Sequence, residues 1–581
     1  MQVGTIVRIS LHGRRVRGWV VAADVVPVAG VELRPLTKVT GHGPTGEVID
    51  LARWARWRWA GRTVHFLRTA SPLNAVAGLP PPISGTSAPH GCPTAQKDGA
   101  QKDGARKDET AAGEPGMAAT LAREGLARSR AVLRLPPGAD VIPAIRVAAQ
   151  QGPTLVVAAS QAAAGEVARR LRQEGGDIAL VPRGWAQAAA GARVVVGARA
   201  AAWAPVISLA AVVVLDEHDE SHQGESSPTW STREVAAERA RRAGAACLWL
   251  SPCPSLEALA WAPLLTPSRA EERNGWPVVD VVDRRREEPL RAGLYSPRLV
   301  DLLRRAAADH ERGGGVRAVC VLNRKGRSAL LACAGCAELA RCERCQAAVG
   351  AGEEATLVCR HCAATRPSLC LACGSTRLKL LRPGVRRVRD DLERLVGVPV
   401  AEVTGDADAA PDLSAVPLLV GTEAVLHRGL RPDVVAFLDL DAELLAPRYR
   451  AGEEALALVA RAARMLGPRA AGGRLVLQTR LPGHEVVQAA LHADPGRVAA
   501  AERTRRAALH FPPVTAMALV SGPPAADYVA GLGATTGVEV LGPADGRWLV
   551  RAADHRVLCD ALAAVPRPPG RLRVAVDPQR M

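Results

Sequence analysis

Eight of the 13 cysteines in this sequence fall between residues 333 and 373 and form four C-x-x-C pairs. The pairs are Cys333 with Cys336, Cys342 with Cys345, Cys359 with Cys362, and Cys370 with Cys373. A C-x-x-C turn presents two thiolates on one side of a tight knuckle, and two knuckles complete the tetrahedral Cys₄ shell that Zn²⁺ prefers. The eight thiolates therefore predict two structural Zn²⁺ ions per chain.

The spacing of the knuckles leaves their partners open, because four knuckles can be combined in three ways. An iron–sulfur cluster is the alternative occupant, whereas a redox role is disfavoured because no pair stands at the start of a helix in a βαβ unit. A complete Cys₄ shell has no open coordination position, so we expect no metal catalysis. We interpret the remaining cysteines as small core or linker residues: Cys92, Cys247, Cys253, Cys320 and Cys559.

The net charge of +17, from 75 Lys and Arg against 58 Asp and Glu, indicates a polyanionic partner. Nucleic acid is the first candidate and a membrane surface the second. The sequence opens without an apolar signal segment, and its longest apolar runs are too short to span a bilayer. We therefore expect a cytoplasmic protein with no membrane partner.

Residues 1–80 read as short strands and turns, which predicts a small β-rich domain. They contain 11 Lys or Arg against 4 Asp or Glu, a formal charge of +7. The candidate phosphate contacts are Arg8, Arg14, Arg15, Arg17, Arg53, Arg56, Arg58 and Arg62. Trp54, Trp57 and Trp59 offer base stacking as one interpretation, but their spacing on a short helix favours packing in a core or interface.

The rest of the chain divides by composition. Residues 81–120 are rich in Pro, Gly and Ser with a repeated Gln-Lys-Asp-Gly-Ala, which predicts a flexible linker. Apolar strands then alternate with amphipathic helices, which predicts parallel α/β sheets in two lobes. The predicted units are a first lobe at 121–270, a second lobe at 271–332 and 376–498, the cysteine region at 333–375 between its halves, and an α+β C-terminal domain at 499–581.

Six short segments carry a family resemblance. They are G-A-R-A-A-A-W-A-P at 197–205, L-D-E-H-D at 215–219, W-L-S-P-C-P-S-L-E at 249–257, V-L-N-R-K-G at 321–326, V-G-T-E at 420–423 and L-D-L-D at 438–441. In this order they are similar to the motifs G-T-R-S-A-x-F-A-P, D-E-E-H, G-S-A-T-P-S-x-E, L-N-R-R-G-Y, V-G-T-Q and D-A-D of the bacterial PriA family (primosomal protein N′). The chain is identified as an actinobacterial-type member of that family with degenerate helicase motifs.

The resemblance implies a nested pairing of the knuckles. One zinc would be held by Cys333, Cys336, Cys370 and Cys373, and the other by Cys342, Cys345, Cys359 and Cys362. It also implies that residues 1–80 bind single-stranded 3′ ends of DNA and that this domain and the zinc region recognise branched forks. The implied partners are other primosome proteins, the single-stranded-DNA-binding protein and the replicative helicase, so the protein would be associated with the nucleoid.

The chain departs from the family where ATP would bind. A P-loop has the pattern G-x-x-x-x-G-K-[ST], whose amides and Lys bind the phosphates. This sequence has no Gly-Lys dipeptide, and L-P-P-G-A-D-V-I at 135–142 stands where the P-loop belongs. Asp140 in that segment would repel a phosphate. The carboxylates of the acidic box at 216–219 are either Mg²⁺ ligands or strand-end acids at a loop, and we favour the second interpretation.

The arginine-finger segment is also altered. V-A-R-A-A-R at 459–464 stands where the family has Q-V-A-G-R-A-G-R, so Arg461 and Arg464 remain but both glycines are lost. We predict that these arginines are ordinary cations of a helix surface. We therefore expect no catalytic residue, no ATP cofactor and no helicase motor. The winged-helix domain of the family is also missing, with the linker in its place.

Three functional hypotheses follow. The first is a DNA-binding replication-restart protein that recognises abandoned or stalled forks and promotes loading of the replicative helicase without a motor of its own. The second is an ATP-dependent 3′-5′ DNA helicase with an atypical nucleotide site, which ATP hydrolysis stimulated by single-stranded DNA would reveal. The third is a zinc-dependent interaction protein that no longer binds DNA, against which the +7 charge of residues 1–80 argues.

Overall fold

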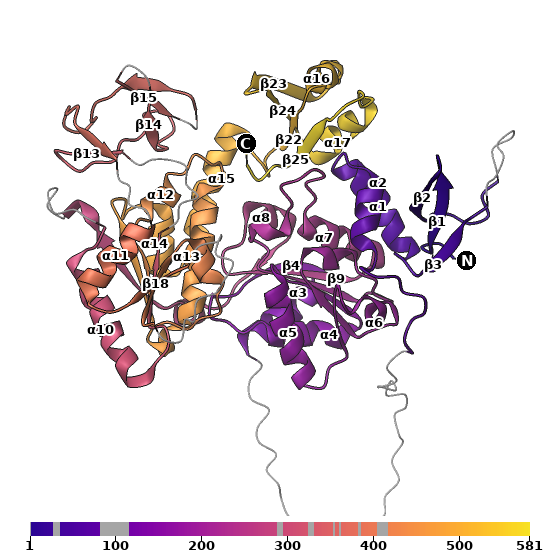
Figure 1. Cartoon of the computed structure of the whole chain (residues 1–581), viewed down its shortest axis with the longest axis horizontal. Helices are drawn as coiled ribbons and strands as arrows, with labels where there is room; N and C mark the ends of the chain where they lie inside the picture. Colours follow the sequence, from indigo (N-terminus) through magenta and orange to yellow (C-terminus); the bar gives the residue numbers. More distant parts are fainter. Residues whose placement is uncertain are drawn as a thin grey trace, which may run out of the picture.

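The computed structural model describes residues 2–26, 35–81, 116–286, 294–322, 331–352, 355–359, 362–380, 385–403 and 416–580 (Figure 1). The linker predicted at 81–120 lies mostly outside these residues, as do Cys92 and residues 323–326 of the fourth motif. The last residues assigned to that linker already belong to a helix that begins at Met117. None of the helices in the described ranges is long and apolar enough to cross a membrane.

The N-terminal module begins with a three-stranded antiparallel sheet in the order β2-β1-β3. Its elements are β1 (Ile6–Leu11), β2 (Arg14–Trp19), β3 (Lys38–Gly41), α1 (Gly46–Arg58) and α2 (Thr63–Ala70). The turn between β1 and β2 is His12-Gly13, with φ of 49° and 73°. Positive φ at both residues gives a tight hairpin whose twist matches the strands. The module is small and starts with β-structure, as expected, and a helix pair completes it.

The first lobe is a seven-stranded parallel sheet in the order β10-β4-β9-β8-β5-β7-β6. Its strands are β4 (Arg130–Arg134), β5 (Thr154–Val157), β6 (Ile178–Leu180), β7 (Val194–Gly197), β8 (Ala211–Leu215), β9 (Ala246–Ser251) and β10 (Leu264–Leu265). Helices α3 (Met117–Ala127), α4 (Ile142–Gln151) and α5 (Gln161–Gln173) cover one face. Helices α6 (Trp185–Ala189), α7 (Thr232–Ala243) and α8 (Leu256–Trp261) contribute to the core of the other. Burial on both faces explains the continuous apolar strands.

The second lobe is a six-stranded parallel sheet in the order β11-β21-β20-β12-β19-β18. Its strands are β11 (Val278–Asp283), β12 (Ala318–Val321), β18 (Val400–Val403), β19 (Leu418–Gly421), β20 (Val434–Phe437) and β21 (Arg474–Thr479). Helices α10 (Pro297–Gly313) and α11 (Val385–Val396) pack on one face. Helices α13 (Ala451–Leu466), α14 (Glu485–His492) and α15 (Gly496–Leu509) pack on the other.

The cysteine region is inserted in the second lobe, between β12 and α11 in the chain. It is built from short strands in two small antiparallel sheets, β13 (Leu331–Cys333) with β17 (Leu378–Leu380), and β14 (Val349–Ala351), β15 (Thr356–Cys359) and β16 (Thr365–Pro367) in one sheet. The region packs on the loop after α12 (Asp441–Leu444), where Ala348 N donates to Leu445 O at 3.2 Å. It therefore rests on the edge of the second lobe where β20 ends.

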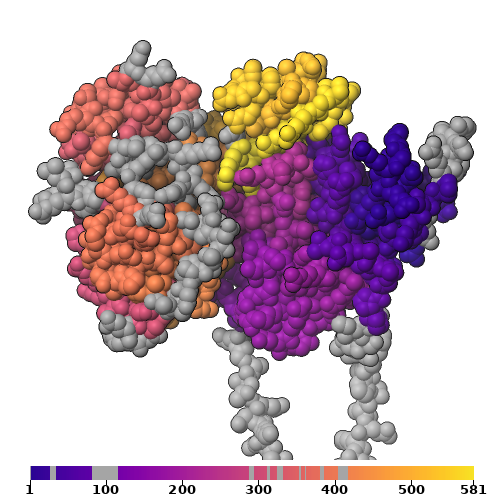
Figure 2. All heavy atoms as spheres, in the orientation of Figure 1, coloured from indigo at the N-terminus to yellow at the C-terminus, as the bar shows by residue number. Residues whose placement is uncertain are grey.

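The C-terminal domain is a four-stranded antiparallel sheet in the order β23-β24-β22-β25 with two helices. Its elements are β22 (Ala516–Ser521), α16 (Ala525–Gly533), β23 (Val538–Ala544), β24 (Arg547–Ala552), α17 (His555–Ala564) and β25 (Arg573–Val576). In Figure 2 it sits above the first lobe and beside the cysteine region. The predicted class is confirmed: a multidomain α/β chain with a small N-terminal β-rich domain, two parallel α/β lobes, a cysteine insertion and an α+β end.

One hydrophobic core joins the two ends of the chain to the first lobe. It contains residues of α1, α2, α7, the 3-10 turn around Trp203 and the C-terminal sheet. A row of aromatic rings runs through it, with centroid distances of 5.3 Å for Trp54–Trp59, 6.5 Å for Trp59–Phe66, 5.4 Å for Phe66–Trp203 and 5.7 Å for Trp203–Trp230. Trp54 and Trp59 therefore pack in a core, and Trp57 donates from its indole to Asp560 at 2.8 Å.

Truncation of Trp203 tests this joint. Trp203→Ala removes a fully buried ring between Phe66 and Trp230, and we expect a loss of about 3–5 kcal/mol of unfolding free energy. Guanidinium unfolding followed by circular dichroism measures it. Trp57→Ala is the matched control, because its ring is only half-buried at the surface. Equal losses in the two variants would contradict the shared core.

Candidate metal centres and nucleic-acid interface

The structure brings the eight knuckle cysteines together in two groups. Cys333, Cys336, Cys370 and Cys373 form one, Cys342, Cys345, Cys359 and Cys362 the other, and in each the sulfur atoms lie within 4.8 Å of one another. The closest pairs, Cys333–Cys373, Cys336–Cys370, Cys342–Cys362 and Cys345–Cys359, are at 3.5 Å. A tetrahedral ion with bonds of about 2.3 Å to sulfur needs sulfur atoms roughly 3.8 Å apart. The donor sets fit a tetrahedral metal ion.

The short strands of the cysteine region hold the knuckles in these two groups. Of the outer knuckles, one begins at Cys333, the last residue of β13, and the other, at Cys370, precedes β17. Of the inner knuckles, one precedes β14 and the other begins at Cys359, the last residue of β15. Gly335 N donates to Cys333 Sγ at 3.3 Å, a contact that stabilises a thiolate. Four sulfur donors complete each shell, so the arrangement can hold the region together but offers no coordination position for a substrate.

A row of cations crosses the N-terminal sheet. Arg8 on β1 lies directly opposite Arg17 on β2 and Lys38 on β3, and all three side chains are exposed. Like charges in cross-strand positions repel one another. The pKa of Arg17 is lowered by partial burial and by repulsion from Arg68 and Arg8. In the described part of the chain none of the three forms an ion pair, so the row is free to bind an anion.

The hairpin and α1 carry most of the remaining predicted contacts. Arg14 and Arg15 are exposed at the start of β2. Arg53, Arg56 and Arg62 line a pocket of about 730 Å³ between the α1–α2 corner and the end of α17, together with Arg567. Arg53 also pairs with Asp50 at 2.7 Å. None of the described residues that line this pocket is acidic, so it is a second site with excess positive charge.

Arg58 was a predicted phosphate contact, and the structure contradicts that role. Its side chain is 4% exposed and pairs with Glu234 of the first lobe and Asp577 of the C-terminal segment, both at 2.7 Å. Burial would lower the pKa of Arg58, but the two carboxylates outweigh it and raise the pKa. A guanidinium enclosed in this way cannot reach a DNA backbone. The sequence carried the signal, since Arg58 continues the buried stripe of Val48, Leu51 and Ala55 on α1.

The loop in the P-loop position, residues 135–141, lies between β4 and α4. Its polar groups bind other groups of the protein. Asp140 Oδ1 accepts from Ile142 N at 3.1 Å, so this carboxylate covers the start of α4, where a phosphate would need free amides. Arg170 binds the same carboxylate at 2.7 and 2.8 Å. A Cβ built on Gly138 would lie 2.9 Å from Pro468 N of the second lobe. The loop is therefore packed against the facing lobe.

The acidic box is likewise engaged by protein groups. Asp216 binds Arg464, Asp219 binds Arg461, and buried Glu217 binds Arg233 and Ser255. Burial opposes ionisation of Asp216 and Asp219, but Arg464 and Arg461 outweigh it and lower the pKa of both carboxyl groups. Burial raises the pKa of Glu217 despite its partners. In this arrangement the carboxylates are neither free Mg²⁺ ligands nor merely strand-end acids.

The prediction that Arg461 and Arg464 are ordinary cations of a helix surface is wrong. Both project from α13 of the second lobe onto the acidic box of the first lobe. Arg464 Nε also donates to Pro137 O at 3.3 Å, so it contacts the P-loop position as well. Sequence reasoning missed these contacts because their carboxylate partners lie more than 240 residues earlier in the chain.

Arg58 and Arg56 make a matched pair for a test. Arg58→Ala removes the cation that pairs with buried Asp577 and partly exposed Glu234, and we expect it to lower the unfolding free energy by about 3–5 kcal/mol. Arg56→Ala removes an exposed cation and should change stability by less than about 0.5 kcal/mol. Guanidinium unfolding of both variants measures the difference. If Arg56→Ala lowered the unfolding free energy more than Arg58→Ala, Arg58 would again be a candidate phosphate contact.

Comparison with known proteins gives relatives that are named as replication restart proteins. The sequence matches no model of a protein family. It is 28% identical over 356 residues to the replication restart protein PriA of Bacillus subtilis, covering 57% of this chain and 43% of that protein. It is 34% identical over 361 residues to the probable replication restart protein PriA of Mycobacterium tuberculosis, covering 59% and 54%. The chain spans about half the length of the curated relatives it matches.

Solved structures are more distant. RecG bound to a three-way DNA junction gives a TM-score of 0.35 at 11% identity over 67% of this chain and 50% of that chain. Dbp5 of S. cerevisiae bound to RNA and ADP BeF3 gives 0.33 at 10% identity, over 64% and 88%. Over more than half of its length the chain is thus similar in sequence to PriA replication restart proteins, which confirms the family resemblance that its motifs indicate.

Proposed function

We propose that the chain is a DNA-binding replication-restart protein that recognises abandoned or stalled forks and promotes loading of the replicative helicase, without helicase activity of its own. The observation that carries DNA binding is the row of Arg17, Arg8 and Lys38, three exposed cations in register with no ion-pair partner in the described ranges. Keeping like charges side by side costs stability unless a polyanion neutralises them. The names of the relatives support the setting of replication restart.

The N-terminal domain is proposed to bind single-stranded 3′ ends, and the cysteine region, with its two proposed Zn²⁺ ions, is the proposed second contact with the fork. A groove of about 780 Å³ is lined by both the cysteine region and the second lobe, and exposed Arg344 is one of its lining residues. The proposed domains remain 1–80, 121–270, 333–375 and 499–581, with the second lobe on both sides of the cysteine region. Two of these boundaries fall inside helices, 121 within α3 and 499 within α15, which packs on the second lobe. Other primosome proteins and the single-stranded-DNA-binding protein are the proposed partners.

The absence of a motor is part of the proposal. Turnover of ATP needs a phosphate cradle, a Lys, a metal-binding acid and an arginine finger that reaches the γ-phosphate. The sequence lacks the Lys, Asp140 covers the helix start, and the candidate acids and fingers bind each other. The alternative, an atypical 3′-5′ helicase, requires these contacts to open for ATP.

The DNA-binding prediction uses two double variants. Arg8→Ala/Arg17→Ala should weaken binding to forked DNA and reduce the slope of log affinity against log salt by about 2, roughly one unit per lost phosphate contact. Arg123→Ala/Arg172→Ala, two exposed cations of the first lobe, is the control and should keep the slope. Binding is measured by fluorescence anisotropy on forked, single-stranded and duplex DNA at several salt concentrations.

Phosphate release is assayed in the same samples. We expect none above background with or without DNA, and DNA-stimulated release would replace the proposal with the helicase alternative. Identical slopes for both double variants would remove the N-terminal row from the interface. No binding to any DNA would leave the zinc-dependent interaction protein as the explanation.

The metal prediction is two Zn²⁺ per chain by elemental analysis of purified protein, with no visible absorption from an iron–sulfur cluster. Cys336→Ser and Cys345→Ser should each lose one zinc, because each removes one ligand of a different shell. Cys320→Ala, a buried cysteine of β12 outside both groups, is the control and should keep both ions. We expect the two serine variants to lose preference for forks but to keep binding to single-stranded 3′ ends.

A further inference from the structure

The two lobes meet through charged groups that face each other across the interface. From α13 of the second lobe, Arg464 binds both oxygens of Asp216 at 2.7 and 2.5 Å. One turn earlier on the same helix, Arg461 binds Asp219 at 2.5 Å and Glu423 at 3.1 Å. A helix places residues three apart on one face, so one side of α13 presents both cations to the first lobe.

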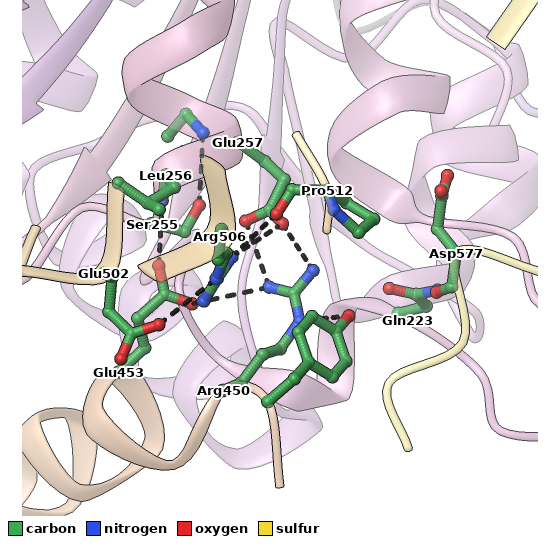
Figure 3. Close-up of polar contacts among 12 residues, drawn as sticks. Gln223, Ser255, Leu256, Glu257, Arg450, Glu453, Glu502, Arg506, Pro512 and Asp577 are labelled. Carbon is green, nitrogen blue, oxygen red and sulfur yellow. Dashed lines mark hydrogen bonds and ion pairs between the residues drawn. The ribbon is translucent and has the colours of Figure 1, made fainter. Parts of the chain in front are cut away.

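A second contact lies around Glu257 of α8 (Figure 3). Glu257 of the first lobe accepts from Arg450 at 3.0 and 2.5 Å and from Arg506 at 3.3 Å. Glu453 of α13 accepts from Leu256 N at 2.9 Å and from Arg506, so the second lobe also supplies a carboxylate to the start of α8. The Arg506 side chain is 1% exposed, which makes this contact part of a buried interface.

The C-terminal segment 577–580 adds a strap over the same interface. Gln223 of the first lobe donates to Asp577 O at 2.6 Å, and Tyr449 of the second lobe donates from its hydroxyl to Pro578 O at 3.1 Å. Arg580 pairs with Glu220 at 3.3 Å. One short segment therefore contacts both lobes within two residues.

The electrostatics favour this arrangement over an open one. Separating the lobes would take Arg450 and Arg506 away from Glu257, whereas Arg506 would keep Glu453 and Glu502 of its own lobe. Breaking a buried ion pair by removing one partner is strongly unfavourable. Burial opposes the charged form of Glu257, but Arg450 and Arg506 outweigh it and lower its pKa. Partly buried pairs are also screened little by salt. The contacts therefore persist under conditions that weaken surface ion pairs.

We propose that these contacts lock the two lobes in one closed arrangement without any nucleotide. In a motor of this kind the acidic box and the arginine fingers serve a bound nucleotide, and the lobes move when it is bound and released. Here the residues in those positions bind each other, so the side chains that would respond to a nucleotide are already paired within the protein. The lobes then act as a rigid platform that keeps the N-terminal module, the zinc region and the C-terminal domain in fixed positions.

This inference goes beyond the proposed function and does not rest on it, since a lock would exist whether or not the chain binds DNA. Its test is amide hydrogen exchange measured by mass spectrometry on the full chain. The informative segments are 138–141 and 216–222, which face the second lobe. Local opening sets the exchange rate of such protected amides.

Arg464→Asp should speed exchange in both segments by at least about tenfold, because it places two carboxylates opposite each other. The exchanged pair Asp216→Arg/Arg464→Asp should restore most of the protection, since it returns opposite charges to the same positions. Arg169→Asp is the control, because Arg169 forms an exposed ion pair with Glu166 inside α5 and should leave both segments unchanged. Zinc content and circular dichroism verify that each variant is folded.

Two outcomes would overturn the lock. One is a folded Arg464→Asp protein whose exchange matches the wild type, or whose faster exchange the exchanged pair does not reverse. The other is a wild-type protein in which Mg²⁺-ATP changes exchange at 138–141 as much as Arg464→Asp does, because a nucleotide would then still control the interface. Loss of DNA binding with these exchange results intact would count against the proposed function alone.

Discussion

The shared core around Trp203 is the contact on which the arrangement of the whole chain depends. It joins the N-terminal helix pair and the C-terminal sheet to the same side of the first lobe, although they stand at opposite ends of the sequence. A row of aromatic rings runs through it, and the buried guanidinium of Arg58 adds ion pairs to Glu234 and Asp577. Because a buried, paired guanidinium tolerates little displacement, this joint fixes the direction in which the C-terminal segment continues.

That direction matters for the interface between the lobes. The residues after β25 pass from Asp577, held by Arg58 and His555, to Pro578, whose carbonyl meets Tyr449 of the second lobe. The joint at the first lobe and the contacts of α13 are therefore linked through a few residues of backbone. A chain whose ends are anchored in this way does not need a nucleotide to bring its lobes together, and it can tolerate the loss of the P-loop without losing its shape.

The charge distribution has two distinct uses in this protein. Arginines such as Arg464, Arg461 and Arg506 are neutralised inside the molecule and contribute to its shape. Arg8, Arg17 and Lys38 lie in register on an exposed sheet with no ion-pair partner among the described residues. The net charge of +17 counts all cationic and anionic residues of the chain together and does not distinguish these two groups. Of these two groups, the second is the one available to a polyanion, and in the proposed assembly the cysteine region adds a further contact surface at the opposite side of the molecule (Figure 1).

The sequence by itself determined the features that depend on neighbours in the chain. Each C-x-x-C knuckle is formed by residues close together in the sequence, and continuous apolar strands predict a buried parallel sheet. The absence of the P-loop Lys can likewise be recognised in the sequence alone. Contacts between distant segments were decided only by the tertiary structure. Knuckle spacing left three pairings open until the two small sheets placed the sulfur atoms, and no local pattern could reveal that Arg464 would meet Asp216. Arg58 lies between these cases, because helical period places it on the buried stripe of α1, but only the fold supplies the two carboxylates that hold its charge there.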